Sequence, residues 1–452
     1  MTTTIRTAAL VVAMFGLAAN GATIDEVIVR QQWPWSTDVR VEYRVTDVTD
    51  PVDISVAAYD GDTPLDASRL ASSMKGDLFG IAKAGYYSFT IDPVAAFGTG
   101  EIAVMNFNVR LSTTTSAANM TDILYKVVDL DSGSVTDITR ADFYGGKYGA
   151  FTTNFSDFAI NNVACATDFK DVLIWTEVTN NPIYKTSKLV LRHIPAASWG
   201  PWTMDAPGGS NGSSNPSSLA SGSQQHLVQL TADYYAGVFP VTQAQHMKIA
   251  GTYGKSFTNE EDYADHLFKP ASGLDWSLGN QGATLLTAKT NSKLLFSLPT
   301  EAQWEFAARG GVTNNALFSK NAAWGQGTLN AIAWNSENTA NTGYSSAQTV
   351  SVGRLAPNAF GLYDVLGNVL EACRDFSNDS TYVWPEDEIA YNPTGVSEAD
   401  AATTNQGIKK HILRGGSVGN SRTACTLRSR YSAGAFTQNN YYGFRVICTV
   451  AE

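Results

Sequence analysis

The chain has 452 residues, of which 44% are hydrophobic and only 16% are charged. A chain of this length and composition buries a sizeable core and divides into about two or three domains, which excludes intrinsic disorder. The formal net charge of −11 and the lack of any Lys/Arg run argue against nucleic acid or an anionic membrane as a partner.

The amino terminus has the pattern of a secretory signal peptide. Arg6 precedes the apolar run 8–19, and the small residues 19–22 then provide a cleavage site. The run is too short to span a bilayer, and no later stretch is long and apolar enough to do so. We therefore expect residues 1–22 to be a signal peptide and the mature protein to be secreted, periplasmic or on the cell surface, with no membrane span. The alternative is a buried first helix.

Residues 23–198 are predicted to form one or more β-rich modules. Apolar and polar residues alternate along Val39–Val45 and Val52–Val56, and Asp50-Pro51 between them is a turn signal. Further strand patterns occupy residues 86–91, 102–111, 123–128, 172–178 and 189–194. Because such strands must lay one face on another sheet, we expect a sandwich of roughly immunoglobulin size. This part contains no catalytic constellation, which favours a positioning or adhesion role.

Two helices are delimited by their end signals. The first is predicted between Thr242 and Gly251, and the second between Thr300 and Gly310. Both begin with Thr-x-x-Gln, a capping box, and both end at glycine. Trp304 lies on the same helical face as the alanines at 307 and 308, so this face is predicted to be core.

Four signatures follow one another in the last third of the chain: Leu298–Arg309 (LPTEAQWEFAAR), Gly361–Glu371 (GLYDVLGNVLE), Leu413–Ser417 (LRGGS) and Gly443–Val446 (GFRV). In that order they resemble the formylglycine-generating enzyme family, also called sulfatase-modifying factors. The resemblance covers residues 199–452 and implies a C-type-lectin-like domain. The whole chain is then expected to be α+β, with an N-terminal all-β sandwich followed by this domain.

The resemblance implies a structural calcium ion at residues 364–371. In the family's pattern, side-chain oxygens at the positions of Asp364 and Glu371 and backbone carbonyls at those of Gly367 and Val369 are the ligands. Calcium takes several hard oxygen ligands, and a tight glycine-containing turn aims them at one point. The alternative is that the aspartate caps a turn and the glutamate pairs with a nearby arginine.

The family's oxidase chemistry uses two thiolates that hold copper(I) in the segment after Arg-Gly-Gly-Ser. Cys425 matches the second thiolate, whereas Asn420 stands where the first is expected. A neutral amide is neither soft nor anionic, so it does not replace a sulfur ligand. If the chain is active, Cys425 and Ser417 are its catalytic residues and copper is its cofactor.

The four cysteines allow three complete pairings, which the sequence alone does not rank. The resemblance favours a disulfide between Cys373 and Cys425, because family members with the first often carry the second. Cys165 and Cys448 are then free or paired with each other. A bond at Cys425 would leave no thiolate for copper.

These observations favour a ligand- or partner-binding module in which Ser417, Asn420 and Arg422 contact a protein or glycan at the cell surface. One alternative is an active oxidase that converts a sulfatase cysteine to formylglycine, and another is a diversified ligand binder of the lectin type. Residues 415–419 match the G-x-S-x-G pattern of hydrolases, but no histidine follows them. The chain also lacks any His-x-x-x-His spacing, which disfavours non-haem iron. The oligomeric state stays open.

Overall fold

The computed structural model describes the following residues, to which all structural statements below refer: 22–31, 37–49, 51–65, 70–78, 80–81, 83–97, 106–115, 122–144, 146–152, 173–204, 226–253, 265–310, 329–339, 348–378, 388–427 and 429–451. The predicted signal peptide, apart from Ala22, and Cys165 lie outside these ranges. No helix among the described residues is long and apolar enough to cross a membrane.

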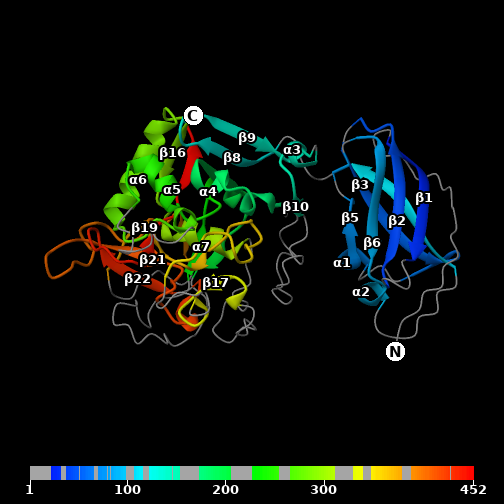
Figure 1. Cartoon of the computed structure of the whole chain (residues 1–452). Coiled ribbons are helices and arrows are strands. Elements are labelled where there is room, and N and C mark those ends of the chain that lie inside the picture. The colour runs from blue at the N-terminus through cyan, green and yellow to red at the C-terminus, as the bar shows by residue number, and fades with distance from the viewer. Residues whose placement is uncertain are drawn as a thin grey trace. The chain divides into compact units, whose positions relative to one another are not determined.

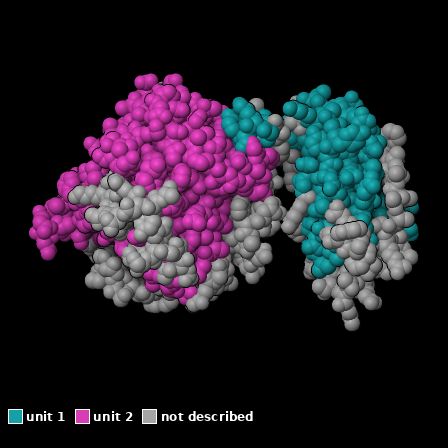
Figure 2. Space-filling view, in the orientation of Figure 1, with its two compact units in different colours: residues 1–122, 139–148 teal, residues 123–138, 149–452 magenta. Residues whose placement is uncertain are grey.

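The chain forms two compact units in which strands predominate and helices are few. Unit 1 comprises residues 1–122 and 139–148, and unit 2 comprises residues 123–138 and 149–452. Figure 2 colours them teal and magenta. Residue 199, where the family-like domain is predicted to begin, lies within unit 2.

Unit 1 contains two antiparallel sheets, of order β1-β2-β6-β5 and β4-β3-β7 (Figure 1). The strands of the first are β1 (Thr23–Gln31), β2 (Val39–Thr46), β6 (Gly85–Ile91) and β5 (Met74–Gly76). Those of the second are β4 (Thr63–Pro64), β3 (Val52–Asp60) and β7 (Phe107–Thr115). Three short helices accompany them: α1 (Leu70–Ser73), α2 (Pro93–Phe97) and α3 (Arg140–Tyr144).

Both sheets of unit 1 contribute to one hydrophobic core. Val41 on β2, Phe89 on β6, Ile54 on β3 and Val109 on β7 belong to the same buried cluster. The alternation predicted for residues 39–45 and 52–56 is confirmed, because β2 and β3 each bury every second residue at their start. The polar residues of β2 consequently lie on the opposite face of the first sheet.

Unit 2 is organised around a six-stranded sheet of order β16-β24-β15-β12-β8-β9. Its strands are β16 (Leu294–Ser297), β24 (Ile447–Val450), β15 (Tyr234–Gly237), β12 (Lys188–Ile194), β8 (Ile123–Asp129) and β9 (Val135–Thr139). β12 pairs antiparallel with both β8 and β15, which joins residues before and after position 199 in one sheet. β24 pairs with both β15 and β16, so the last strand lies inside the sheet.

A second sheet of unit 2, of order β22-β21-β19-β23, carries the family-like motifs. Its strands are β22 (Arg430–Gly434), β21 (Lys410–Arg414), β19 (Leu370–Phe376) and β23 (Tyr442–Gly443). Smaller sheets are formed by β13 (Trp202–Met204), β14 (His226–Gln229) and β20 (Ile389–Tyr391), by β17 (Ala333–Trp334) and β18 (Leu366–Gly367), and by β10 (Phe151–Thr152) and β11 (Ile174–Trp175).

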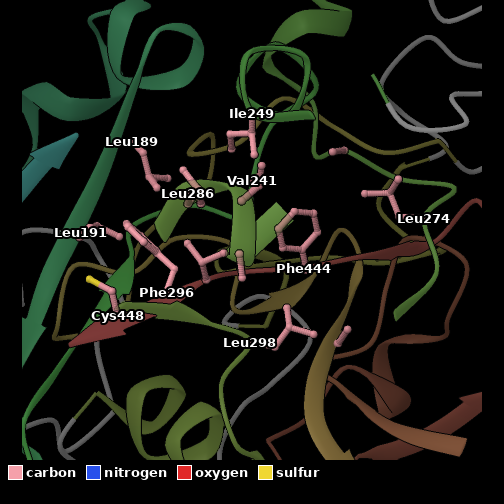
Figure 3. Packing of buried hydrophobic residues seen from close by; sticks show 14 of the residues in the cluster. Leu189, Leu191, Val241, Ile249, Leu274, Leu286, Phe296, Leu298, Phe444 and Cys448 are labelled. Atoms are coloured by element: carbon pink, nitrogen blue, oxygen red, sulfur yellow. The ribbon is translucent and has the colours of Figure 1, made fainter. Parts of the chain in front are cut away.

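The α-helices of unit 2 are α4 (Ile183–Thr186), α5 (Gln243–Ala250), α6 (Trp276–Lys289) and α7 (Glu301–Arg309). Both predicted capping boxes are confirmed, and α5 and α7 end at glycines with left-handed φ of 74° and 62°. The predicted core face of α7 is also confirmed, since Trp304 is 3% exposed. Figure 3 shows the core near α6, where Leu286 and Phe444 belong to one buried cluster.

Candidate functional site

Ser417, Asn420, Arg422 and Cys425 lie on one loop that follows β21. Ser417 Oγ donates a 2.7 Å hydrogen bond to Asn420 Oδ1, and the Asn420 backbone N–H donates to the Ser417 carbonyl at 3.0 Å. The serine and asparagine side chains therefore hold each other in place. Asn420 and Arg422 are half-buried and face solvent in part, whereas Ser417 is 1% exposed.

The two glycines before Ser417 are required by the close packing of this loop. Gly415 and Gly416 have φ of 91° and 76°, a conformation that favours glycine. A Cβ atom on Gly416 would lie 2.8 Å from Cys425 Sγ, and one on Gly415 would lie 2.8 Å from the Val365 carbonyl oxygen. The Arg-Gly-Gly-Ser sequence thus allows the loop to pass directly over the cysteine.

Cys425 lies beneath the loop as a buried thiol. Its exposed fraction is 0%, and its Sγ donates to the Ser417 carbonyl at 3.6 Å. Burial raises the pKa of the Cys425 thiol to about 12, so the thiol keeps its proton at neutral pH. Trp304 and Leu427 belong to the same apolar cluster as Cys425.

The disulfide expected between Cys373 and Cys425 is absent from the structure. Both residues are free thiols in the same hydrophobic cluster, and Cys373 is 0% exposed. Burial raises the pKa of Cys373 well above the ordinary value of a thiol. The two cysteines therefore pack as small apolar side chains, the usual role of buried free cysteine. Cys448 is a third buried free thiol.

A second segment, around Ser336 and Glu337, borders the site. The Ser336 backbone N–H donates to the Asn420 carbonyl at 2.9 Å. Glu337 Oε1 accepts from the Arg422 backbone N–H at 3.2 Å, and Glu337 Oε2 lies 3.5 Å from Arg422 Nη1. We call Ser336, Glu337, Asn420 and Arg422 the polar rim. Its first two members carry no sequence motif and are brought to the site by contacts across more than 80 residues.

Asp364 caps a turn in the segment where calcium was predicted. The residue is 3% exposed and has φ of 53°. Its Oδ2 accepts from the Gly353 backbone N–H at 2.7 Å, and its Oδ1 accepts from Asn368 Nδ2 at 3.4 Å. Burial raises the pKa of Asp364 to about 6, although the bond from Gly353 acts in the opposite direction.

Glu371 is paired with an arginine from the last signature. Its Oε1 lies 3.0 Å from Arg445 Nη2, and its Oε2 accepts from Trp304 Nε1 at 2.7 Å. Arg445 also donates to the carbonyls of Gly237 and Tyr363, each at 2.6 Å.

The Glu371 carboxylate does not fit the role of a calcium ligand, because a guanidinium already neutralises it and would repel a dication. The arrangement matches the alternative of a capping aspartate and an ion-paired glutamate. No group of three or more His, Cys, Asp or Glu residues in the described part of the chain is placed to hold a metal.

A buried ionic network fixes the strand that leads into the site. Arg414 on β21 contacts Glu305 and lies 3.4 Å from Glu301, both on α7. Arg430 on β22 contacts Glu301, and Arg309 pairs with Glu305 at 2.5 Å. Moving α7 away from β21 would leave buried charges without partners, which costs several kcal/mol. The network therefore holds α7 and β21 in one position. The network thereby sets where the Arg-Gly-Gly-Ser loop begins.

Comparisons with known proteins find formylglycine-generating enzymes that are similar to part of this chain. The formylglycine-generating enzyme of Thermomonospora curvata is 33% identical over 114 residues, which cover 24% of this chain and 37% of that protein. That of Mus musculus is 32% identical over 144 residues, covering 31% of this chain and 34% of that protein. The matches thus span about a third of each relative. The solved structure of PvdO from Pseudomonas aeruginosa is 23% identical, with a TM-score of 0.44 over 58% of this chain and 94% of that one.

Residues 198–450, more than half of the chain, match the family model described as a sulfatase-modifying factor enzyme 1-like domain. The chain therefore belongs to the sulfatase-modifying factor family.

Proposed function

We propose that this chain is a ligand- or partner-binding member of the family and does not carry out the oxidase reaction. The observation that carries the proposal is the pairing of Ser417 with Asn420 above Cys425. Where the family's pattern has a thiolate, the structure has an amide oxygen that accepts a 2.7 Å hydrogen bond from Ser417.

The residues present do not fit copper(I). Cys425 is the one thiol of the loop and is 0% exposed, so the loop offers a single, buried sulfur. Copper(I) prefers soft anionic sulfur, and an asparagine amide offers a hard neutral oxygen. Cys373 belongs to the same cluster, but it is 0% exposed and lies on β19, not on the loop.

The polar rim offers the chemistry of a recognition surface. Ser336, Asn420 and Arg422 supply hydrogen-bond donors and Glu337 supplies acceptors, all on backbone positions fixed by hydrogen bonds between the two segments. A rim of this kind suits a protein or glycan at the cell surface. The proposal includes secretion through residues 1–22 and a positioning role for unit 1, as a β-sandwich whose two sheets share one core.

A copper titration combined with a turnover assay tests the loss of oxidase activity. Reduced protein is titrated with copper(I) and incubated with a peptide that contains Cys-x-Pro-x-Arg, and aldehyde is detected by mass spectrometry. We expect no stoichiometric copper complex and no aldehyde. The Asn420→Cys variant, which restores the second sulfur, is expected to bind copper more tightly than the wild type. Aldehyde formation by the wild-type protein would show that it is an oxidase.

Binding at the rim is tested on arrays of glycans and of cell-surface proteins. We expect Asn420→Ala and Arg422→Ala to lose the signal that the wild type gives. Arg374→Ala is the matched control, because Arg374 is an exposed arginine of β19 outside the rim. The proposed binding role is contradicted if all variants give the same signal or if the wild type gives none.

A further inference from the structure

The outer face of the first sheet of unit 1 carries charged and aromatic side chains. Antiparallel pairing places Glu26, Arg44 and Tyr86 in one row across β1, β2 and β6, and Ile28, Glu42 and Ser88 in the next row. Here the three strands present both charges together with an aromatic ring.

A pocket of about 390 Å³ opens on this face. Its lining includes Glu26, Arg40, Glu42, Asp77, Tyr86 and Tyr87. The volume falls in the range of roughly 300 to 1,000 Å³ that is typical of small-molecule sites. The pocket lies wholly within unit 1, so it is separate from the polar rim of unit 2.

The floor of the pocket is held in place by the core. Tyr43 is 1% exposed, and its hydroxyl donates to the Asp77 carbonyl. Asp77 Oδ2 accepts from the Ser88 backbone N–H at 3.1 Å, and the Tyr87 hydroxyl donates to the Lys83 carbonyl at 2.7 Å. These bonds fix the segment of Asp77 against β6, so the pocket exists before any ligand arrives.

Tyr86 is left without cover although it is large and apolar. Its exposed fraction is 71%, the highest among the exposed large hydrophobic residues of the described chain. The Arg44 guanidinium carbon lies 5.7 Å from the centre of the Tyr86 ring. This contact leaves most of the ring exposed. An exposed tyrosine gives a binding surface a rigid, amphipathic platform at low entropic cost.

The charges of the lining select the class of ligand. Ion pairs neutralise most of the charges around the pocket. Glu42 lies 3.1 Å from Arg40 and 3.2 Å from Arg30, and Arg44 lies 3.6 Å from Asp25, so neither an anion nor a cation is attracted strongly. The Glu26 carboxylate makes no ion pair or hydrogen bond with other described side chains, so an apolar ligand would bury it without compensation. A neutral sugar avoids this cost, because its hydroxyls donate to carboxylates and its C–H face stacks on an aromatic ring.

We propose that this pocket binds a neutral oligosaccharide, with Tyr86 as the stacking platform and Glu26 and Asp77 as acceptors for sugar hydroxyls. The site adds a second binding surface to the chain and does not depend on the function proposed for unit 2.

Isothermal titration calorimetry on the full chain tests the site. The probes are cellohexaose, maltohexaose and hexa-N-acetylchitohexaose as neutral chains, a hyaluronan hexasaccharide as the anion and a chitosan hexamer as the cation. We expect at least one neutral chain to bind and both charged chains to bind more weakly. Tyr86→Ala is expected to weaken the neutral ligand about tenfold, and Glu26→Gln to weaken it about threefold or more.

Tyr59→Ala is the matched control, because Tyr59 also stacks with an arginine, Arg110, at 4.0 Å but lies on β3 of the other sheet. It is expected to bind like the wild type. The proposal is overturned if no neutral chain binds, if a charged chain binds best, or if Tyr59→Ala and Tyr86→Ala lose affinity equally. Thermal unfolding of each variant identifies any variant that fails to fold. If Tyr86→Ala fails to fold, the affinity of Glu26→Gln, which keeps the side-chain volume, tests the proposal instead.

Discussion

Glu371 and Arg445 form a buried ion pair, with 3.0 Å between Oε1 and Nη2 and with both side chains at most 3% exposed. They come from two different signatures of the family, 74 residues apart. Arg445 also donates to carbonyls of Gly237 and Tyr363, so one guanidinium links β15, the turn before β18 and β19. The pair connects the central sheet of unit 2 to the sheet that carries the Arg-Gly-Gly-Ser loop.

Replacing Arg445 by methionine is expected to destabilise the protein by about 3 to 5 kcal/mol, because Glu371 would remain as an uncompensated buried charge. Denaturant unfolding monitored by tryptophan fluorescence measures the loss. Lys248→Met is the control, since Lys248 pairs with Asp131 at 2.5 Å on the surface of the same unit. That change is expected to cost at most about 1 kcal/mol. Similar losses for both variants would contradict the role given to the buried pair.

Calcium is expected to have no effect on stability. The Glu371 carboxylate is occupied by Arg445 and Trp304, and Asp364 accepts from Gly353. The melting temperature should therefore be the same with excess chelator and with millimolar calcium. A ligand that binds only the folded state increases stability as its concentration rises. A rise of the melting temperature with calcium concentration would therefore support the predicted calcium site at residues 364–371.

The three described cysteines are expected to resist alkylation in the native state. Burial raises the pKa of Cys425 and of Cys448 to about 12 each, so almost no thiolate is present at pH 8. Iodoacetamide labelling followed by peptide mass spectrometry should modify peptides with Cys373, Cys425 and Cys448 only after unfolding. Rapid native labelling of Cys425 would mean that the loop opens, and would make a metal-binding role for this thiol tenable again.

The pH dependence of stability should include a contribution from Asp375. Burial raises the pKa of this carboxyl from 3.8 to about 7, and its Oδ2 accepts from the Glu301 backbone N–H at 2.9 Å. Because the folded pKa is the higher one, its favourable contribution is complete below pH 4 and is lost as the pH rises towards 7.

Asp375→Asn removes this titration while keeping an acceptor oxygen. We expect the variant to be more stable than the wild type at pH 8, by on the order of 2 kcal/mol, and to lose this advantage at pH 4. Chemical unfolding at a series of pH values measures the difference. A constant difference across the series would mean that Asp375 does not titrate in this range.

The features that the sequence predicts well are those with a local signal. The strands β2 and β3 follow from alternation, and α5 and α7 follow from Thr-x-x-Gln and a terminal glycine. Ser417, Asn420, Arg422 and Cys425 are predicted as site residues because they lie in or just after the Arg-Gly-Gly-Ser signature.

Other features depend on contacts between distant residues. Helix α6 has a weak pattern, because the positions that meet Phe444 are Gly279 and Gly282, where a Cβ would lie 3.3 and 3.2 Å from the ring. Glu337 reaches Arg422 across 85 residues, and no motif marks it. The sequence also does not predict that β8 and β12 belong to unit 2. Their place there depends on the pairing of β8 with β12 and of β12 with β15, which the sequences of these strands do not reveal.

The place of β24 between β15 and β16 has a consequence for synthesis. Residues 447–450 supply the backbone hydrogen-bond partners of both β15 and β16. These two strands therefore cannot join in one sheet until residues 447–450 have left the ribosome. Unit 1 finds all its strand partners within the first 115 residues and is free to form much earlier. The two units are thus expected to fold at different moments, and a stalled nascent chain should protect unit 1 from protease while unit 2 is still cut.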